Sequence, residues 1–147
     1  MTTFADHASA IRSRFETQFP PLRSTTPILW PNERLNPAPD PNTDGNGLQG
    51  WVSFEVRSGQ EKAAGFGSLG ANRWRQSGEA IIRIFVPVTI GETLVRDIAA
   101  DATLIFRGYQ AGDLKFFAAS TTGGDISEDG NWYELDAICS FTADIIG

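Results

Sequence analysis

The chain has one cysteine, one histidine and one methionine among 147 residues, and these shortages exclude several kinds of site. A single cysteine forms no disulfide within the chain, and one cysteine with one histidine is too few ligands for zinc. His7, in the N-terminal segment, leaves no support for a Ser-His-Asp or Cys-His arrangement. Cys139 belongs to an alternating apolar pattern, so it is expected to be a buried residue in a protein of a reducing compartment.

Long hydrophobic runs are also missing. No stretch approaches the ~20 apolar residues of a membrane span, and no basic region followed by an apolar run marks a secretory signal. The hydrophobic content of 41%, with 10 Phe and 4 Trp, is typical of a globular protein. The length predicts a single domain over residues 1–147, large enough to bury a core without disulfides.

Basic residues are outnumbered, and the charge is unevenly placed. The net charge is −6 and the pI is about 4.7. Residues 57–75 carry four bases and one acid (+3), whereas residues 113–147 carry seven acids and one base (−6). Arg73-Trp74-Arg75 has the residue types that stack on bases and hold phosphates, but the acidic chain lacks a basic footprint. Because Trp and Arg are also enriched at protein–protein hot spots, a protein interface is the favoured interpretation.

Two amphipathic helices are predicted. The first spans residues 3–19, where Thr3 and Asp6 have the spacing of a capping box and Pro20-Pro21 is expected to end the helix. The second spans residues 91–107, with Thr89 and Glu92 as candidate caps and Gly108 as the stop.

Short strands are expected between and after these helices, at residues 26–29, 51–57, 80–89, 114–120 and 132–142. The last strand alternates clearly, with one set facing inward and Trp132 in the set facing outward; the inward set is Tyr133, Leu135, Ala137, Cys139 and Phe141. Residues 36–50, rich in proline and glycine, are expected to form a surface loop. The order of elements predicts an α+β fold, with an antiparallel β-sheet of about four to five strands and two helices packed on one face.

The segment between Arg57 and Ile81 is far longer than the usual hairpin loop of two to five residues. It is Gly-rich and mostly polar, so we expect a long projecting β-hairpin arm that contacts another molecule. The candidate contact residues of this interface are Arg57, Lys62, Phe66, Arg73, Trp74 and Arg75. An acidic loop is the candidate complementary surface, through Asp125, Glu128, Asp129 and Trp132.

Three motifs resemble ligand sites without the required context. Residues 65–70 fit Gly-x-Gly-x-x-Gly, but they lie in the predicted arm and not in a strand-to-helix turn. Residues 40–51 resemble the first half of an EF-hand calcium loop, but Trp51 is at the last ligand position and prolines flank the segment. Residues 125–136 match better, with Asp136 at the last position, but a predicted strand follows where an EF-hand needs a helix. The sequence therefore predicts no metal, no cofactor and no catalytic residues.

Several short motifs in order resemble the tail terminator-like family of long-tailed bacteriophages. They are Trp30-Pro31-Asn32-Glu33, residues 51–59 from Trp51 to Gly59, residues 73–78 from Arg73 to Gly78, Ile84 to Pro87 with Gly91, Phe106-Arg107-Gly108, and Gly130 to Tyr133. The similarity covers essentially the whole chain, although the loop at residues 36–50 is longer than expected for the family.

The resemblance implies a small α+β subunit of a hexameric ring, a homohexamer that caps the tail tube and ends its polymerisation. It implies tail-tube and head–tail connector or neck proteins as partners, with no membrane and no sequence-specific nucleic acid, although DNA would pass through the ring. The expected location is the head-proximal end of the virion tail, after assembly in the host cytoplasm. The alternatives are a tail-tube or neck completion protein of the same construction, and a small ligand-binding or enzymatic α+β domain.

Overall fold

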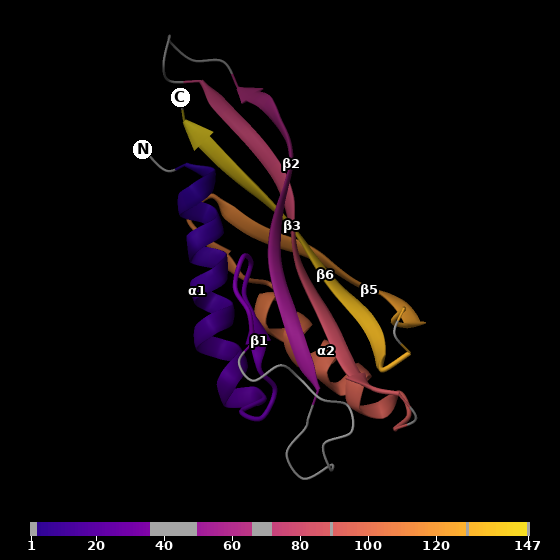
Figure 1. The fold of residues 1–147 in the computed structure, drawn as a ribbon. Coiled ribbons are helices and arrows are strands. Elements are labelled where there is room, and N and C mark those ends of the chain that lie inside the picture. The colour runs from indigo at the N-terminus through magenta and orange to yellow at the C-terminus, as the bar shows by residue number, and fades with distance from the viewer. Residues whose placement is uncertain (1–2, 36–49, 66–71, 89, 129, 147) are drawn as a thin grey trace.

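A computed structural model describes residues 3–35, 50–65, 72–88, 90–128 and 130–146 (Figure 1). Two helices and six strands follow one another as α1 (Phe4–Leu22), β1 (Ile28–Leu29), β2 (Trp51–Gly65), β3 (Arg73–Pro87), α2 (Thr93–Phe106), β4 (Gln110–Ala111), β5 (Leu114–Ile126) and β6 (Trp132–Ile146). The strands form one sheet in the order β1-β2-β3-β6-β5-β4. The predicted α+β class is confirmed, although the sheet has six strands, of which β1 and β4 have two residues each.

Helix α1 begins as predicted and ends later than predicted. The capping box is present, since the Thr3 side chain accepts from the Asp6 N–H and the Asp6 carboxylate accepts from the Thr3 N–H. The helix continues through Pro20 and Pro21 to Leu22. Proline has a φ close to the helical value, so in a last turn it removes hydrogen bonds without diverting the chain.

Helix α2 is closed at its end by Gly108, whose φ of +69° favours glycine. At its start, Glu92 occupies the N-cap position but makes no side-chain capping hydrogen bond. Its carboxylate instead accepts from the Tyr133 hydroxyl at 2.8 Å and from Arg96 Nε at 3.0 Å. The other proposed cap, Thr89, lies outside the described residues.

The strands are much longer than the sequence predicts. β2 pairs with β3 as far as Gly65 and Arg73, and β3 pairs with β6 from Pro87 to Arg73. The predicted loop at residues 121–131 is also partly strand, because β5 continues to Ile126 beside β6. Polar and small residues form these extensions because the partner strand satisfies their backbone hydrogen bonds, which overrides their weak strand propensity.

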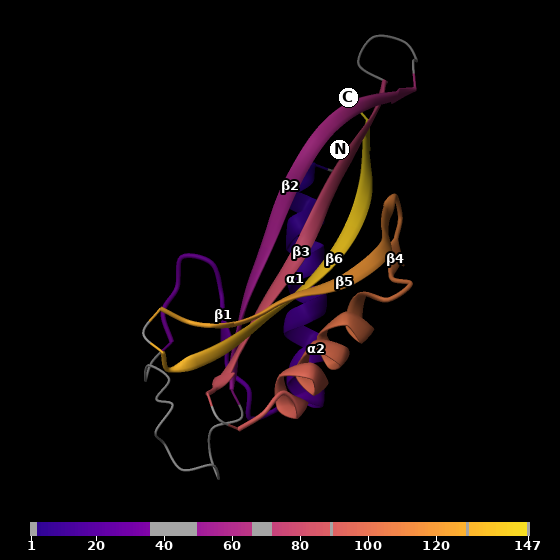
Figure 2. The same cartoon turned by 90° about the vertical axis from the view of Figure 1, so that its right-hand side faces the viewer.

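The sheet is mixed, contrary to the prediction of an antiparallel sheet. β1 runs parallel to β2 through Ile28 and Leu29, whereas every other pair is antiparallel. Figure 2 shows β2, β3 and β6 rising together as long, twisted strands with α1 alongside them.

The core lies between the sheet and both helices, as predicted. Phe15 of α1 is its centre, and its ring stacks on Phe19 and Phe54 with centroids 4.7 Å apart. The ring of Phe106, from α2, lies 6.2 Å from that of Phe15. The inward set of β6 joins this cluster: Leu135, Ala137, Cys139 and Phe141 are buried, and Tyr133 packs against them.

Trp132 is not the exposed residue that the alternation predicts. It is only 7% exposed, because its ring packs edge-on against Trp51 at 6.0 Å. Trp51 in turn stacks on Phe85, with centroids 4.1 Å apart. An aromatic cluster therefore covers part of the second face of the sheet, where simple two-fold alternation predicts a polar surface.

Candidate assembly surface

The arginines of the predicted arm are bound within the chain. Arg75 donates from Nε and Nη2 to the two carboxylate oxygens of Asp144, at 2.8 and 3.1 Å. Arg73 lies 3.7 Å from the same carboxylate. Because β3 is paired with β6 on one side and β2 on the other, this half of the arm is a central strand of the sheet. The basic and acidic regions of the sequence thus meet partly within the same chain.

Asp144 is buried, and its hydrogen bonds from Arg75 lower the pKa of its carboxyl group, with further lowering by the charges of Arg75, Arg73 and Lys115. A lowered pKa in the folded state stabilises the protein at pH values above the unfolded-state pKa of about 4. That stabilisation is lost as the pH falls through the lower folded-state value.

We therefore expect Asp144→Asn to lower the melting temperature at pH 7 and to have a smaller effect as the pH falls below about 4. Thermal unfolding followed by circular dichroism at several pH values measures this difference. Asp97→Asn, at an exposed position of α2, is the control and should change little at any pH. An Asp144→Asn effect of equal size at every pH would show that charge does not cause it.

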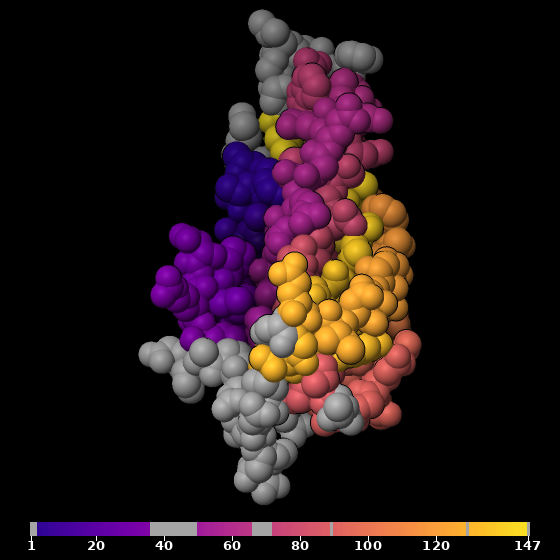
Figure 3. All heavy atoms as spheres, turned by 45° about the vertical axis from the view of Figure 1, so that its right-hand side comes forward, coloured from indigo at the N-terminus to yellow at the C-terminus, as the bar shows by residue number. Residues whose placement is uncertain are grey.

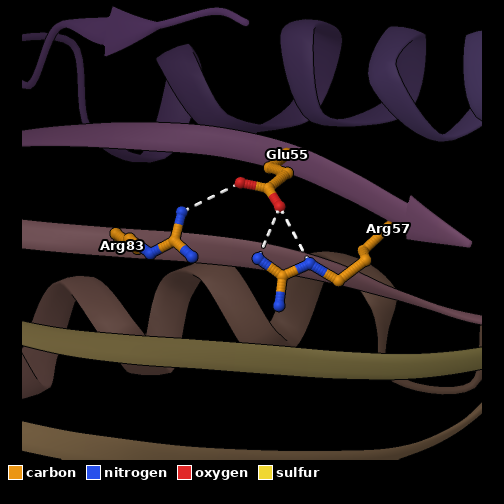
Figure 4. Close-up of polar contacts among 3 residues, drawn as sticks. All are labelled: Glu55, Arg57 and Arg83. Carbon is orange, nitrogen blue, oxygen red and sulfur yellow. Dashed lines mark hydrogen bonds and ion pairs between the residues drawn. The ribbon is translucent and has the colours of Figure 1, made fainter.

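Arg57 is likewise held by its own chain (Figure 4). It donates from Nε and Nη2 to Oε1 of Glu55, at 3.0 and 2.8 Å, while Arg83 donates from Nη1 to Oε2 at 2.9 Å. The Arg83 hydrogen bond, followed by that of Arg57, lowers the pKa of Glu55. This cluster joins β2 to β3, and neither Glu55 nor Arg83 was among the predicted contact residues.

The other predicted arm residues have different surroundings. Lys62 is exposed on β2, opposite Arg75 in the strand register. Trp74 is half-buried on β3, and its register partners are Ala63 and Ile145. Phe66 lies outside the described residues.

The predicted acidic loop is at the β5–β6 turn. Asp125 and Glu128 are exposed, whereas Trp132 is buried and Asp129 lies outside the described residues. Burial raises the pKa of nearby Glu134, and the charge of Asp136 raises it further. The described part of the chain contains no group of three or more His, Cys, Asp or Glu residues that could hold a metal ion.

The exposure of strand β5 is the feature that the sequence interpretation missed, although it predicted a strand at residues 114–120. Both faces of its second half are exposed, and two of its large apolar residues, Phe117 and Ile126, are 66% and 63% exposed. Between them lie small residues, from Ala118 to Gly124, followed by Asp125. In Figure 3, β5 (orange) forms part of the molecular surface. The available signal was this run of small residues after two phenylalanines, which lacks the alternation of a half-buried strand.

A groove lies next to each of the two long strands nearest the edges of the sheet, β5 and β2. The β5 groove, of about 390 Å³, lies between the end of α2 and β5, and Phe106, Phe116, Phe117 and Ala119 are among its lining residues. The β2 groove, of about 250 Å³, lies between α1 and β2 and is lined by Ala8, Ser9, Arg12, Pro31, Phe54 and Val56. The two grooves combine apolar walls with an adjacent strand, which is a common setting for protein contacts.

Cys139 is buried as predicted, and desolvation raises the pKa of its thiol to about 11. His7 is also buried, on the core-facing side of α1. None of the helices in the described ranges has the length and apolar character needed to span a membrane.

No protein-family model and no curated protein matches the chain. Among the 22 chains of solved structures that match it, one aligns with a TM-score of 0.56 at 15% sequence identity. The alignment covers 95% of this chain and 95% of that structure. Because one fold carries many functions, a similarity at this identity concerns architecture alone. The chain is thus similar in fold to a solved protein of comparable length.

Proposed function

We propose that the chain is the structural subunit of a ring, most simply a hexamer, that caps a phage or phage-derived tail tube. The observation that carries the proposal is the presence of two open edges on opposite sides of one sheet. In the described part of the chain, β1 covers β2 only at Val52 and Ser53, and β4 covers β5 only at Leu114 and Lys115. A subunit with two different open edges can bind a neighbour on each side, as a ring requires.

The end of the β2–β3 hairpin supports the same proposal. Both strands extend beyond the start of α1 (Figure 1), so the hairpin end projects from the helical layer. We propose this end, with Lys62 and Trp74, as a contact with the tail tube or an adjacent subunit. The resemblance of the sequence motifs to tail terminator-like proteins adds the specific role: to end tube polymerisation and join the tail to the neck.

Deleting the gene is expected to give tails of uncontrolled length that fail to join heads, because a polymer without its cap continues to grow. Electron microscopy of particles from the deletion strain measures tail length directly, and a plasmid copy of the gene should restore it. Tails of normal length and a normal yield of complete particles would contradict the proposal.

A tail-tube subunit is the second candidate, because a tube also needs two open edges. The copy number per particle separates the two functions. A cap has a fixed number of copies, whereas a tube protein has a number proportional to tail length. Quantitative mass spectrometry of purified particles with long and short tails measures this ratio.

A further inference from the structure

The two open edges are named here the β2 edge, residues 54–65, and the β5 edge, residues 116–126. Each is exposed along much of its length, and no described strand pairs with its outer side. The β5 edge has nine consecutive residues, 116–124, without a charge or a proline. Folded proteins usually block open edges with such residues, since an unpaired strand is a template for another strand.

Strand direction fixes how two copies would meet. β2 is antiparallel to β3, β3 to β6, and β6 to β5, so β2 and β5 run in opposite directions within one chain. A rotation about an axis roughly along the strands preserves these directions. Copies related by such a rotation would therefore bring the β5 edge of one beside the β2 edge of the next as an antiparallel pair.

We propose that these two edges join in this way, so that a continuous sheet passes from subunit to subunit. The inference rests on the proposed ring and identifies its contact surfaces. The contact is heterologous, because two different edges meet, and it closes only when the ring is complete.

The strand register shows which part of the β2 edge would lie beside the exposed Phe117 of a neighbouring copy. Ala118 aligns with Ser140, Ser140 with Glu79, and Glu79 with Arg57, while Phe116 aligns through Phe141 and Gly78 with Ser58. Phe117 of one copy would therefore lie beside Arg57 and Ser58 of the next, within two residues of Val56. Val56 lines the β2 groove, where Phe54 and Pro31 are further apolar residues. The exposed ring of Phe117 would pack in the neighbour's β2 groove, removing apolar surface from water.

The same alignment also brings two opposite charges, those of Lys62 and Asp113, to a similar level along the strands. Lys62 aligns with Arg75 and Asp144, two residues beyond the pair formed by Thr142 and Lys115. Asp113 lies in the turn between β4 and β5, two residues before Lys115. Extending the β5 alignment by two residues brings it close to the level of Lys62, and both side chains are exposed. The pairing of copies thus places opposite charges together, which favours a second copy of this chain as the partner.

Cysteine cross-linking tests the proposal. A chain carrying both Ser58→Cys and Ala118→Cys should, with a short flexible bis-maleimide, give a ladder of covalent oligomers on a denaturing gel. Each single variant alone should stay monomeric, whereas a mixture of the two single variants should give dimers and no larger species. The wild type shows the background from Cys139, whose buried thiol reacts slowly.

Phe117→Ala in the double-cysteine chain should reduce the ladder about tenfold or more, as expected for an interface aromatic. A Ser58→Cys, Asp97→Cys chain is the control for random collisions, since Asp97 is exposed on α2 and belongs to neither edge strand. A double-cysteine ladder no stronger than this control would overturn the proposal. Covalent dimers of the Ala118→Cys single variant would also overturn it, since they would show that like edges meet. Either result would leave the tail-length test of the ring function unaffected.

Discussion

Gly78→Ala is expected to lower the free energy of unfolding by about 2–3 kcal/mol, because there is no room for a methyl group at this position. A Cβ atom there would lie 2.6 Å from Cζ of Phe141 and 2.8 Å from the backbone oxygen of Arg57. Phe141 is fully buried opposite Gly78, so its ring has little freedom to move aside. The expected drop in melting temperature is roughly 6–10 °C for a domain of this size.

Gly65→Ala is the matched control for Gly78→Ala. Its Cβ would lie 3.7 Å from Cβ of Arg73, which is an ordinary contact. We expect a change within ~0.5 kcal/mol for this exposed region. Chemical denaturation of both variants measures the difference, and equal stabilities would show that the Phe141 ring can repack around a methyl group.

Gly78 also illustrates the limit of the sequence interpretation. In the sequence it lies in a polar, Gly-rich segment, which is typical of a loop. In the structure it is a buried residue of a central strand, and its lack of a side chain makes space for Phe141. Local sequence does not reveal this role, because the residue that needs the space is 63 positions away in the chain.

Features set by nearby residues were predictable. The capping box of Thr3 and Asp6, the end of α2 at Gly108 and the buried set of β6 each depend on local spacing. The extent of β2, β3 and β5 depends instead on partner strands that are distant in sequence. Trp132 was wrongly predicted to be exposed for the same reason, because it is covered by Trp51, which is distant in sequence.

The same distinction between local and distant influences applies to the candidate contact residues. Charge and composition drew attention to Arg57, Arg73 and Arg75, but the structure gives each of them a carboxylate partner in its own chain. The β5 edge has no charge pattern, and its exposure is visible only once the strand order is known. Pairing between strands therefore changes which residues are the best candidates for contact with a neighbour.

Phe15→Ala is expected to lower the free energy of unfolding by about 3–5 kcal/mol, more than Gly78→Ala does. The side chain is fully buried and lies among the aromatic rings of α1, β2 and α2: Phe19, Phe54 and Phe106, with Trp30 edge-on. Its removal leaves a cavity at the point where both helices meet the sheet. The melting temperature should fall by roughly 10 °C or more.

Phe117→Ala is the matched control, since it removes the same atoms from a side chain that is 66% exposed. We expect it to change the stability of the isolated subunit by no more than ~0.5 kcal/mol while weakening the contact between copies. Melting curves and cross-linking yields of both variants, measured on the same preparations, separate the two roles. If Phe117→Ala lowers the melting temperature as much as Phe15→Ala does, then Phe117 supports the fold of its own subunit. If it changes neither stability nor cross-linking, the β5 edge does not use this ring to bind a neighbour.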